Sequence, residues 1–211
     1  PPPRAVLNMP FSEEIPTLTP VGITRWKGEE WITQRALDTA NFTVEKDALT
    51  LCGNGLDLCD RKMQGLLLVR QQERAFTAET ALEIPAAGTA GLTCYYDEHS
   101  YLKFGIGPEG LLLEEYAGYE VVSRQTAPLP ASTSHVRLRV TAADGQRHFA
   151  IQDRTDWHTL WSIPEPRYLT SEGLQCGKRF TGAMVGLYVH GASAVRFADW
   201  VAVWPHPEEK R

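Results

Sequence analysis

Apolar and polar residues alternate with a period of two over several segments of this chain. Those segments are 76–84, 134–141, 184–189 and 196–204. In the second of them Val136, Leu138 and Val140 share one face, while charged and polar residues occupy the other. This pattern predicts a strand with one face in a core and one face in water. Segment 184–189 is apolar at nearly every position, which predicts a strand buried on both faces.

Turn residues separate these segments at short intervals. Asp144-Gly145 lies between two alternating stretches and is a strong hairpin signal. Residues 97–100 and 107–110 are further breaks in the pattern. Only residues 34–49 could be argued to form a helix, and their apolar spacing is irregular. Many short strands separated by turns predict an all-β fold, either an antiparallel β-sandwich or a barrel.

Length and charge narrow the classes of protein. A chain of 211 residues suits one large all-β domain with an ample buried core. Its 21 Lys and Arg residues against 26 Asp and Glu give a net charge of -5, which is not the basic footprint of a nucleic-acid-binding protein. No apolar run approaches the roughly 20 residues of a membrane helix. We therefore expect neither a nucleic acid nor a membrane as a partner.

The N-terminal segment differs from the rest in composition. Residues 1–20 are rich in proline and are expected to form a stiff linker or an extended segment, with a single domain over 21–211. This start has neither an initiator Met nor the pattern of a secretion signal, which favours a longer parent protein, a further domain on this side, or processing. The cellular compartment stays open.

The cysteines are too few for a disulfide scaffold in a chain of this length. They are Cys52, Cys59, Cys94 and Cys176. Their spacing does not match a zinc site, so we expect buried free thiols.

Adjacent carboxylates are the first candidates for catalysis, since glycoside hydrolysis typically uses two of them around one bond. The pairs are Glu13-Glu14, Asp97-Glu98 and Glu114-Glu115. Neighbours on a strand point to opposite faces, so none of these pairs is a natural couple, and we expect solvated charges. The chain also has no G-x-S-x-G elbow and no metal-ligand spacing among its six His. These failures predict that the chain holds no catalytic residue of its own.

Aromatic side chains remain as a source of carbohydrate binding, because flat rings stack on sugar faces. The chain has six Trp, most of which we expect in the core. Tyr95 and Tyr96 beside a polar turn, and Trp157 after a polar stretch, are the candidates most expected to be exposed.

Several segments, taken in order, resemble one known domain family. They are G-L-D-L at 55–58, L-V-R-Q-Q at 68–72, F-T-A-E-T at 76–80, A-G-L-T-C-Y-Y-D at 90–97, F-T-G-A-M-V-G-L at 180–187 and D-W at 199–200. The run is similar to that of the C-terminal concanavalin A-like β-sandwich of glycoside hydrolase family 43, the β-xylosidase and α-L-arabinofuranosidase group. The likeness extends over roughly residues 30–204, in order, and it implies an antiparallel two-sheet jelly roll.

The resemblance also implies a partner. In such enzymes the sandwich packs against a five-bladed propeller that carries the catalytic carboxylates, on the same or a separate chain, and 211 residues cannot hold both domains. The sandwich contributes support, oligomer contacts and sometimes one aromatic ring that closes the substrate pocket. The F-T-G segment implies that Phe180 is this ring, which would exclude water from a narrow sugar pocket. From the residues alone, Phe180 could equally be a core side chain at the start of a strand.

Some sandwiches of this family hold a structural calcium through acidic groups near the domain start and an Asp in a closing D-[FWY] pair. Asp199 is the closing candidate, and Glu13 and Glu14 are the opening ones. Calcium requires about six to eight oxygen ligands. This chain departs from the family pattern at both places, and a shift of one residue would turn Asp199 to the other face of its strand. We therefore expect no cofactor, with calcium at these residues as the alternative.

Three functions follow from these observations. The leading one is a non-catalytic accessory sandwich of a family 43 glycosidase that acts on xylo- or arabino-oligosaccharides. The second is a stand-alone, lectin-like binding module for xylan or arabinan, and the third is a structural domain that forms a homo-oligomer. A binding module predicts coplanar exposed aromatics on one face, whereas an accessory domain predicts an exposed apolar patch where the propeller docks.

Overall fold

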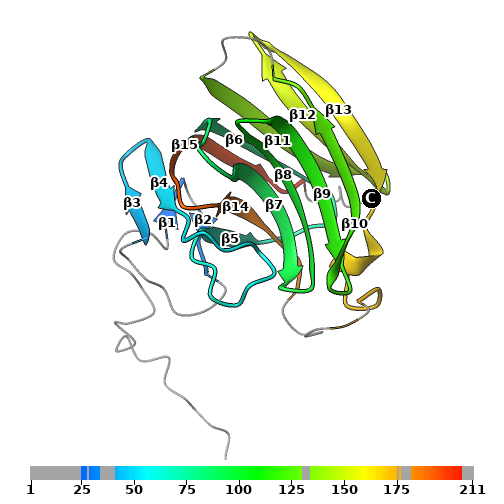
Figure 1. The fold of residues 1–211 in the computed structure, drawn as a ribbon. Coiled ribbons are helices and arrows are strands. Elements are labelled where there is room, and N and C mark those ends of the chain that lie inside the picture. Colours follow the sequence, from blue (N-terminus) through cyan, green and yellow to red (C-terminus); the bar gives the residue numbers. More distant parts are fainter. Residues whose placement is uncertain are drawn as a thin grey trace, which may run out of the picture.

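The computed structural model describes residues 25–27, 29–33, 41–129, 134–174, 176 and 182–205. Two antiparallel sheets form a sandwich, and their layers lie face to face (Figure 1). The seven-stranded sheet has the order β13 (Asp156–Pro164), β12 (Gln146–Asp153), β11 (His135–Ala143), β6 (Phe76–Glu83), β15 (Ala194–Val203), β4 (Ala48–Cys52) and β3 (Phe42–Val44). The six-stranded sheet has the order β10 (Glu120–Ala127), β9 (Gly110–Ala117), β8 (Ser100–Gly107), β7 (Thr89–Asp97), β14 (Met184–His190) and β5 (Leu66–Arg70). Strands β1 (Arg25–Trp26) and β2 (Glu29–Glu30) pair separately.

The main core fills the space between the two sheets. It is built from the apolar positions that the alternation indicated, such as Val136, Leu138 and Val140 of β11. These three side chains are buried while their neighbours on the strand are half-buried or exposed. Strand β14 is buried on both faces over most of its length, as predicted. The β-sandwich alternative of the sequence analysis is thereby confirmed.

A smaller apolar cluster covers the outer face of the six-stranded sheet. Segment 53–65, between β4 and β5, lies over this face and contributes Leu58 and Met63. These side chains pack with Tyr95, Tyr101 and Tyr188, which point away from the main core. This second layer explains why strands in the middle of the sheet are buried on both sides.

The predicted turn at Asp144-Gly145 joins β11 and β12. Both residues have positive φ, 51° and 73°, which suits the two-residue turn of a tight hairpin. The helical alternative for residues 34–49 is wrong in the part that can be compared, because 42–44 and 48–52 are strands. Leu49 and Leu51 are fully buried against the sandwich, so burial with period two overrides the irregular helical spacing. Residues 34–40 lie outside the described part of the chain.

A β-bulge interrupts strand β15. The pairing with β6 shifts register between Ala198 and Val201, and Asp199 has a φ of 52°. Phe197 and Trp200 are consequently both buried although they are three residues apart. Segment 196–204 is a strand over most of its length, as predicted, but its alternation changes phase at the bulge.

The four cysteines are free, as expected, but only Cys94 is buried; Cys59 is exposed and the other two are half-buried. Burial raises the pKa of the Cys94 thiol, so it stays protonated near neutral pH. None of the described helices has the length and apolar character needed to cross a membrane.

Candidate functional site

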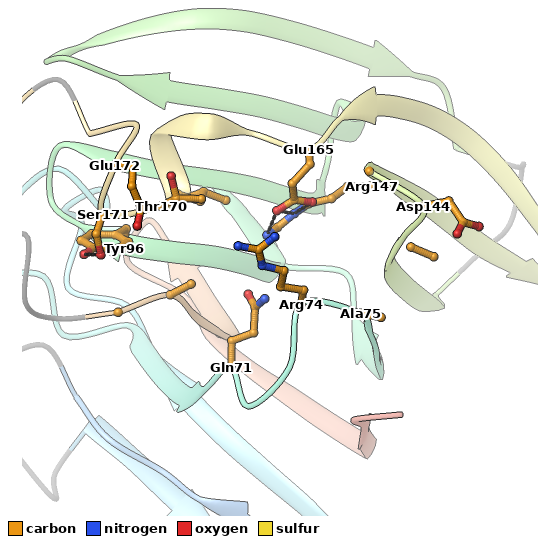
Figure 2. Close-up of a pocket in the computed structure, with 15 residues that line it drawn as sticks. Gln71, Arg74, Ala75, Tyr96, Asp144, Arg147, Glu165, Thr170, Ser171 and Glu172 are labelled. Carbon is orange, nitrogen blue, oxygen red and sulfur yellow. Dashed lines mark hydrogen bonds and ion pairs between the residues drawn. The ribbon is translucent and has the colours of Figure 1, made fainter. Parts of the chain in front are cut away.

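A cavity of about 920 Å³ opens at one end of the sandwich (Figure 2). Its walls come from the β5–β6 connection, Tyr96 near the end of β7, the β11–β12 hairpin, the segment 165–172 and the residues just before β14. The polar side chains that matter for its chemistry are Gln71, Arg74, Tyr96, Arg147, Glu165 and Ser171. These elements are far apart in sequence, and the pairing of the strands brings them to one end.

A buried ion pair forms one wall of the cavity. Arg147 lies on the same face of β12 as Phe149, and it is only 1% exposed. Its Nη2 donates to Glu165 Oε1 at 2.6 Å, and its Nε donates to Oε2 at 3.0 Å. The backbone N–H of Glu165 donates to the Gly145 carbonyl at 2.8 Å, which holds the carboxylate beside the turn. A bidentate pair of this kind fixes both side chains in one geometry.

Hydroxyl groups form the opposite wall. The Tyr96 hydroxyl and the Ser171 hydroxyl lie 3.0 Å apart. Segment 167–173 is held by a short 3-10 helix, Arg167–Leu169, and by the Thr170 side chain, which donates to the Arg167 carbonyl at 2.8 Å. Tyr168 in this segment donates its hydroxyl to Glu115 at 2.7 Å, so the wall is tied to the six-stranded sheet.

The three candidate aromatic residues do not share a surface. Tyr95 and Tyr96 are each 1% exposed, so the expectation that they are exposed is wrong. Tyr95 packs on the outer face of its sheet beside Tyr101, whereas Tyr96 faces the core and lines the cavity. Trp157 belongs to the other sheet and is half-buried, with the Arg139 guanidinium 3.7 Å from its ring centroid. Adjacent residues on one strand point to opposite faces, which is why this pair of tyrosines separates.

Phe180, Glu13 and Glu14 lie outside the described residues. The chain is described again from Gly182, which lines the cavity together with Ala183. Asp199 is exposed at the bulge of β15. Within the described ranges no three His, Cys, Asp or Glu side chains gather as metal ligands would. Calcium binding at these positions stays a prediction.

The expectation that the acidic pairs are solvated is wrong for two of them. Asp97 and Glu98 are 4% and 6% exposed, and Glu98 Oε1 accepts a contact from Arg61 Nε at 2.8 Å. The side chains of Glu114 and Glu115 point to opposite faces of the sheet, as neighbours on a strand do. Glu114 is buried on the outer face of the sheet, and Glu115 accepts from Tyr168 on the side toward the cavity.

An ion cluster that the sequence analysis missed lies under segment 53–65. Lys103 Nζ is 2.7 Å from Asp57 Oδ2 and 2.6 Å from Glu114 Oε1, and both Lys103 and Glu114 are nearly fully buried. Arg124 donates to Glu114 from the neighbouring strand through its Nε at 2.8 Å. His190 Nδ1 lies 3.7 Å from Asp57 Oδ2. A charged residue between Leu102 and Phe104 in an otherwise apolar strand was the available signal.

Asp57 is expected to make stability depend on pH in the acid range. Burial opposes its ionisation, but the charge and hydrogen bond of Lys103 and the nearby His190 hold its pKa below the ordinary value. A lowered pKa stabilises the fold above the unfolded-state pKa of about 4, and this contribution is lost as the pH falls through the folded pKa. Asp57→Asn should therefore reduce stability at pH 7, and its difference from the parent chain should shrink below about pH 4.

Urea unfolding of both chains between pH 7 and pH 3 measures this difference. Asp47→Asn is the matched control, because Asp47 is 73% exposed and pairs with Lys27 only at the surface. A difference between Asp57→Asn and the parent chain that stays constant down to pH 3 would contradict the role of the carboxylate.

Comparison with known proteins agrees with this architecture. The family model of the beta-xylosidase C-terminal concanavalin A-like domain matches residues 27–201, which is more than half of the chain. A beta-xylosidase of Bacillus subtilis (strain 168) is 27% identical over 169 residues, covering 72% of this chain and 32% of the relative. The chain thus spans about a third of the length of that curated relative.

Solved structures share the fold. A xylan beta-1,4-xylosidase from Bacillus halodurans C-125 has a TM-score of 0.69 at 20% identity, covering 82% of this chain and 36% of that one. A functionally unknown protein from Saccharomyces cerevisiae has a TM-score of 0.56 at 18% identity, covering 84% of this chain and 96% of that one. At these identities the likeness concerns the fold alone. Together with the family match over 27–201, the two-sheet sandwich shows that this chain belongs to the family of C-terminal concanavalin A-like domains of beta-xylosidases.

Proposed function

We propose that this chain is the non-catalytic accessory sandwich of a family 43 glycosidase and that it supports a five-bladed propeller, on the same or a separate chain. The observation that carries this proposal is that the chain matches only one part of a longer glycosidase. The family model spans residues 27–201 of this chain, while the matched beta-xylosidase is covered over only 32% of its length. In such a relative, the remaining length has room for a catalytic propeller. We propose that the substrates of this propeller are xylo- or arabino-oligosaccharides.

The cavity end of the sandwich is the end we assign to the propeller. Gly182 and Ala183, which directly follow Phe180-Thr181, line the cavity. Register places Met184 opposite Tyr95, and it places the turns after β7 and β9 at this same end. We therefore propose that Phe180 acts at this end, where an aromatic ring would exclude water from a sugar pocket of the docked partner.

Exposed apolar side chains at the same end support this assignment. Tyr119, Val121 and Val122 follow β9 and are 63%, 46% and 51% exposed. Tyr119 contacts His99, whose turn connects β7 to β8, with ring centroids 4.1 Å apart. A group of large apolar side chains in water is the feature that an accessory domain was expected to show where its partner docks. Contact with the propeller would bury them.

Expression of the complete coding frame tests the accessory role. We expect that frame to encode an upstream propeller, and we expect release of aryl xyloside or aryl arabinofuranoside to need the propeller and to fall when residues 27–201 are deleted. The 211-residue chain alone should release neither. Hydrolysis by this chain alone, or full activity of the enzyme after deletion of residues 27–201, would contradict the proposal.

Phe180→Ala in the complete enzyme tests the pocket role. We expect kcat/KM to fall by about tenfold or more, because the open pocket admits water, while the Tm of the sandwich stays the same. Phe180→Tyr should retain most of the activity and serves as the conservative control. A parallel loss of Tm in Phe180→Ala, without a specific loss of kcat/KM, would assign Phe180 to the core instead.

A further inference from the structure

The cavity contains polar groups that neither the ion pair nor the accessory role uses. Arg74 is exposed on its rim, and its guanidinium forms no hydrogen bond or ion pair with the described residues. In Figure 2 this guanidinium points up into the cavity toward Glu165 and Arg147, with the Gln71 amide below it. A long cationic side chain directed inward, instead of out into water, is positioned to meet a ligand.

Two buried polar atoms on the cavity walls also have no partner among the described residues. They are Nη1 of Arg147 and Oε1 of Gln71. Arg147 is only 1% exposed, so its Nη1 is shielded from bulk water, and the polar neighbour of its guanidinium besides Glu165 is the weakly hydrogen-bonding Cys94 thiol. Leaving a buried donor or acceptor unpaired destabilises the protein, which favours any occupant that pairs it. One orphan is a donor and the other an acceptor.

The charges of the cavity favour a neutral occupant. Glu165 neutralises Arg147 within the wall, and Glu172 and Asp144 also line the cavity, so the charge of Arg74 leaves no positive surplus. A site for phosphate or sulfate would carry a surplus of positive charge. The hydroxyls of Tyr96 and Ser171 add groups that can either donate or accept. Such a mixture of donors and acceptors matches the hydroxyl groups of a sugar, each of which donates and accepts.

We propose that this cavity binds a neutral saccharide within the sandwich itself. Arg74 donates to one sugar hydroxyl, while Glu165 and Gln71 accept from others. The volume of about 920 Å³ lies within the range of roughly 300–1,000 Å³ of small-molecule sites, which accommodates one or two sugar rings. All the described residues that line this site belong to the sandwich. The proposed function enters this inference only through the choice of xylose- and arabinose-based sugars as probes in the experiment below.

Titration calorimetry and saturation-transfer NMR on the 211-residue chain test the inference with xylobiose, arabinobiose and cellobiose. We expect saturable binding of at least one of these sugars, with a Kd on the order of 1 mM. Arg74→Ala and Gln71→Ala should each weaken binding by about tenfold, because hydrogen bonds to the sugar are lost. The matched control is Arg196→Ala, since Arg196 is an exposed arginine on β15 that pairs with Glu45. It should bind like the parent chain.

The outcomes separate this inference from the proposed function. Binding of none of the three sugars would overturn it, and so would binding that Arg74→Ala and Gln71→Ala leave unchanged. Either result would leave the docking of the propeller and the Phe180 experiment untouched. Binding of cellobiose but not of the pentose sugars would support the saccharide site while weighing against a xylan or arabinan substrate. The unfolding midpoints of both variants should match the parent chain, which excludes a loss of fold.

Discussion

Lys103→Met is expected to lower the free energy of unfolding by about 3–5 kcal/mol. The substitution keeps the length of the side chain but removes the ammonium that lies between Asp57 and Glu114, at 2.7 Å and 2.6 Å from their oxygens. Glu114 is 1% exposed, so it keeps a buried charge that only Arg124, a mostly exposed side chain, still neutralises. Segment 53–65 also loses its attachment through Asp57. Urea unfolding at pH 7 measures the loss.

A second substitution, Glu114→Gln in the Lys103→Met background, tests whether the unpaired charge of Glu114 causes the loss of stability. Removing the unpaired charge of Glu114 should recover part of the lost stability. The double variant should therefore lose less free energy of unfolding than the two single variants added together, by about 0.5–3 kcal/mol. Lys27→Ala provides the surface comparison, because Lys27 pairs with a mostly exposed Asp47, and its effect should stay below about 1 kcal/mol. Strict additivity of the two substitutions would show that the cluster contributes packing alone.

Glu165→Ala is expected to destabilise the chain by about 3 kcal/mol, the lower end of the range for broken buried pairs. The lower value applies because the Glu165 side chain is 34% exposed, so water replaces part of its interaction. Arg147 cannot be solvated in the same way, since it lies between Cys94, Phe76 and the core. Thermal and urea unfolding of the isolated chain give the measurement.

Arg147→Met should cost less than Glu165→Ala, because it removes the buried charge and leaves its partner within reach of water. Glu45→Ala is the control for a surface pair with arginine, and it should change stability by less than about 1 kcal/mol. A larger loss in Arg147→Met than in Glu165→Ala would mean that the packing of the arginine stem outweighs the pairing of its charge.

Local pattern in the sequence was enough to locate the main strands and the tightest turn. Val136, Leu138 and Val140 are buried as the alternation predicts, because a strand that packs on one face must place every second side chain in the core. Asp144-Gly145 forms the predicted hairpin for the equally local reason that both residues tolerate positive φ. The ordered motifs over roughly residues 30–204 also named the family that the model match over 27–201 bears out. These features depend on neighbours in the chain.

Which polar residues are buried, and which of them meet, was decided by the tertiary structure. Arg147 finds Glu165 18 residues away, and Lys103 finds Asp57 46 residues away. The sequence alone does not show that these side chains meet, so none of the four was a candidate before the structure was known. Segment 53–65 covers the outer face of the six-stranded sheet, and it hides Tyr95, which was expected to be exposed beside a polar turn. The cavity has the same origin, since its walls come from five separate segments that only the pairing of the strands brings to one end of the sandwich.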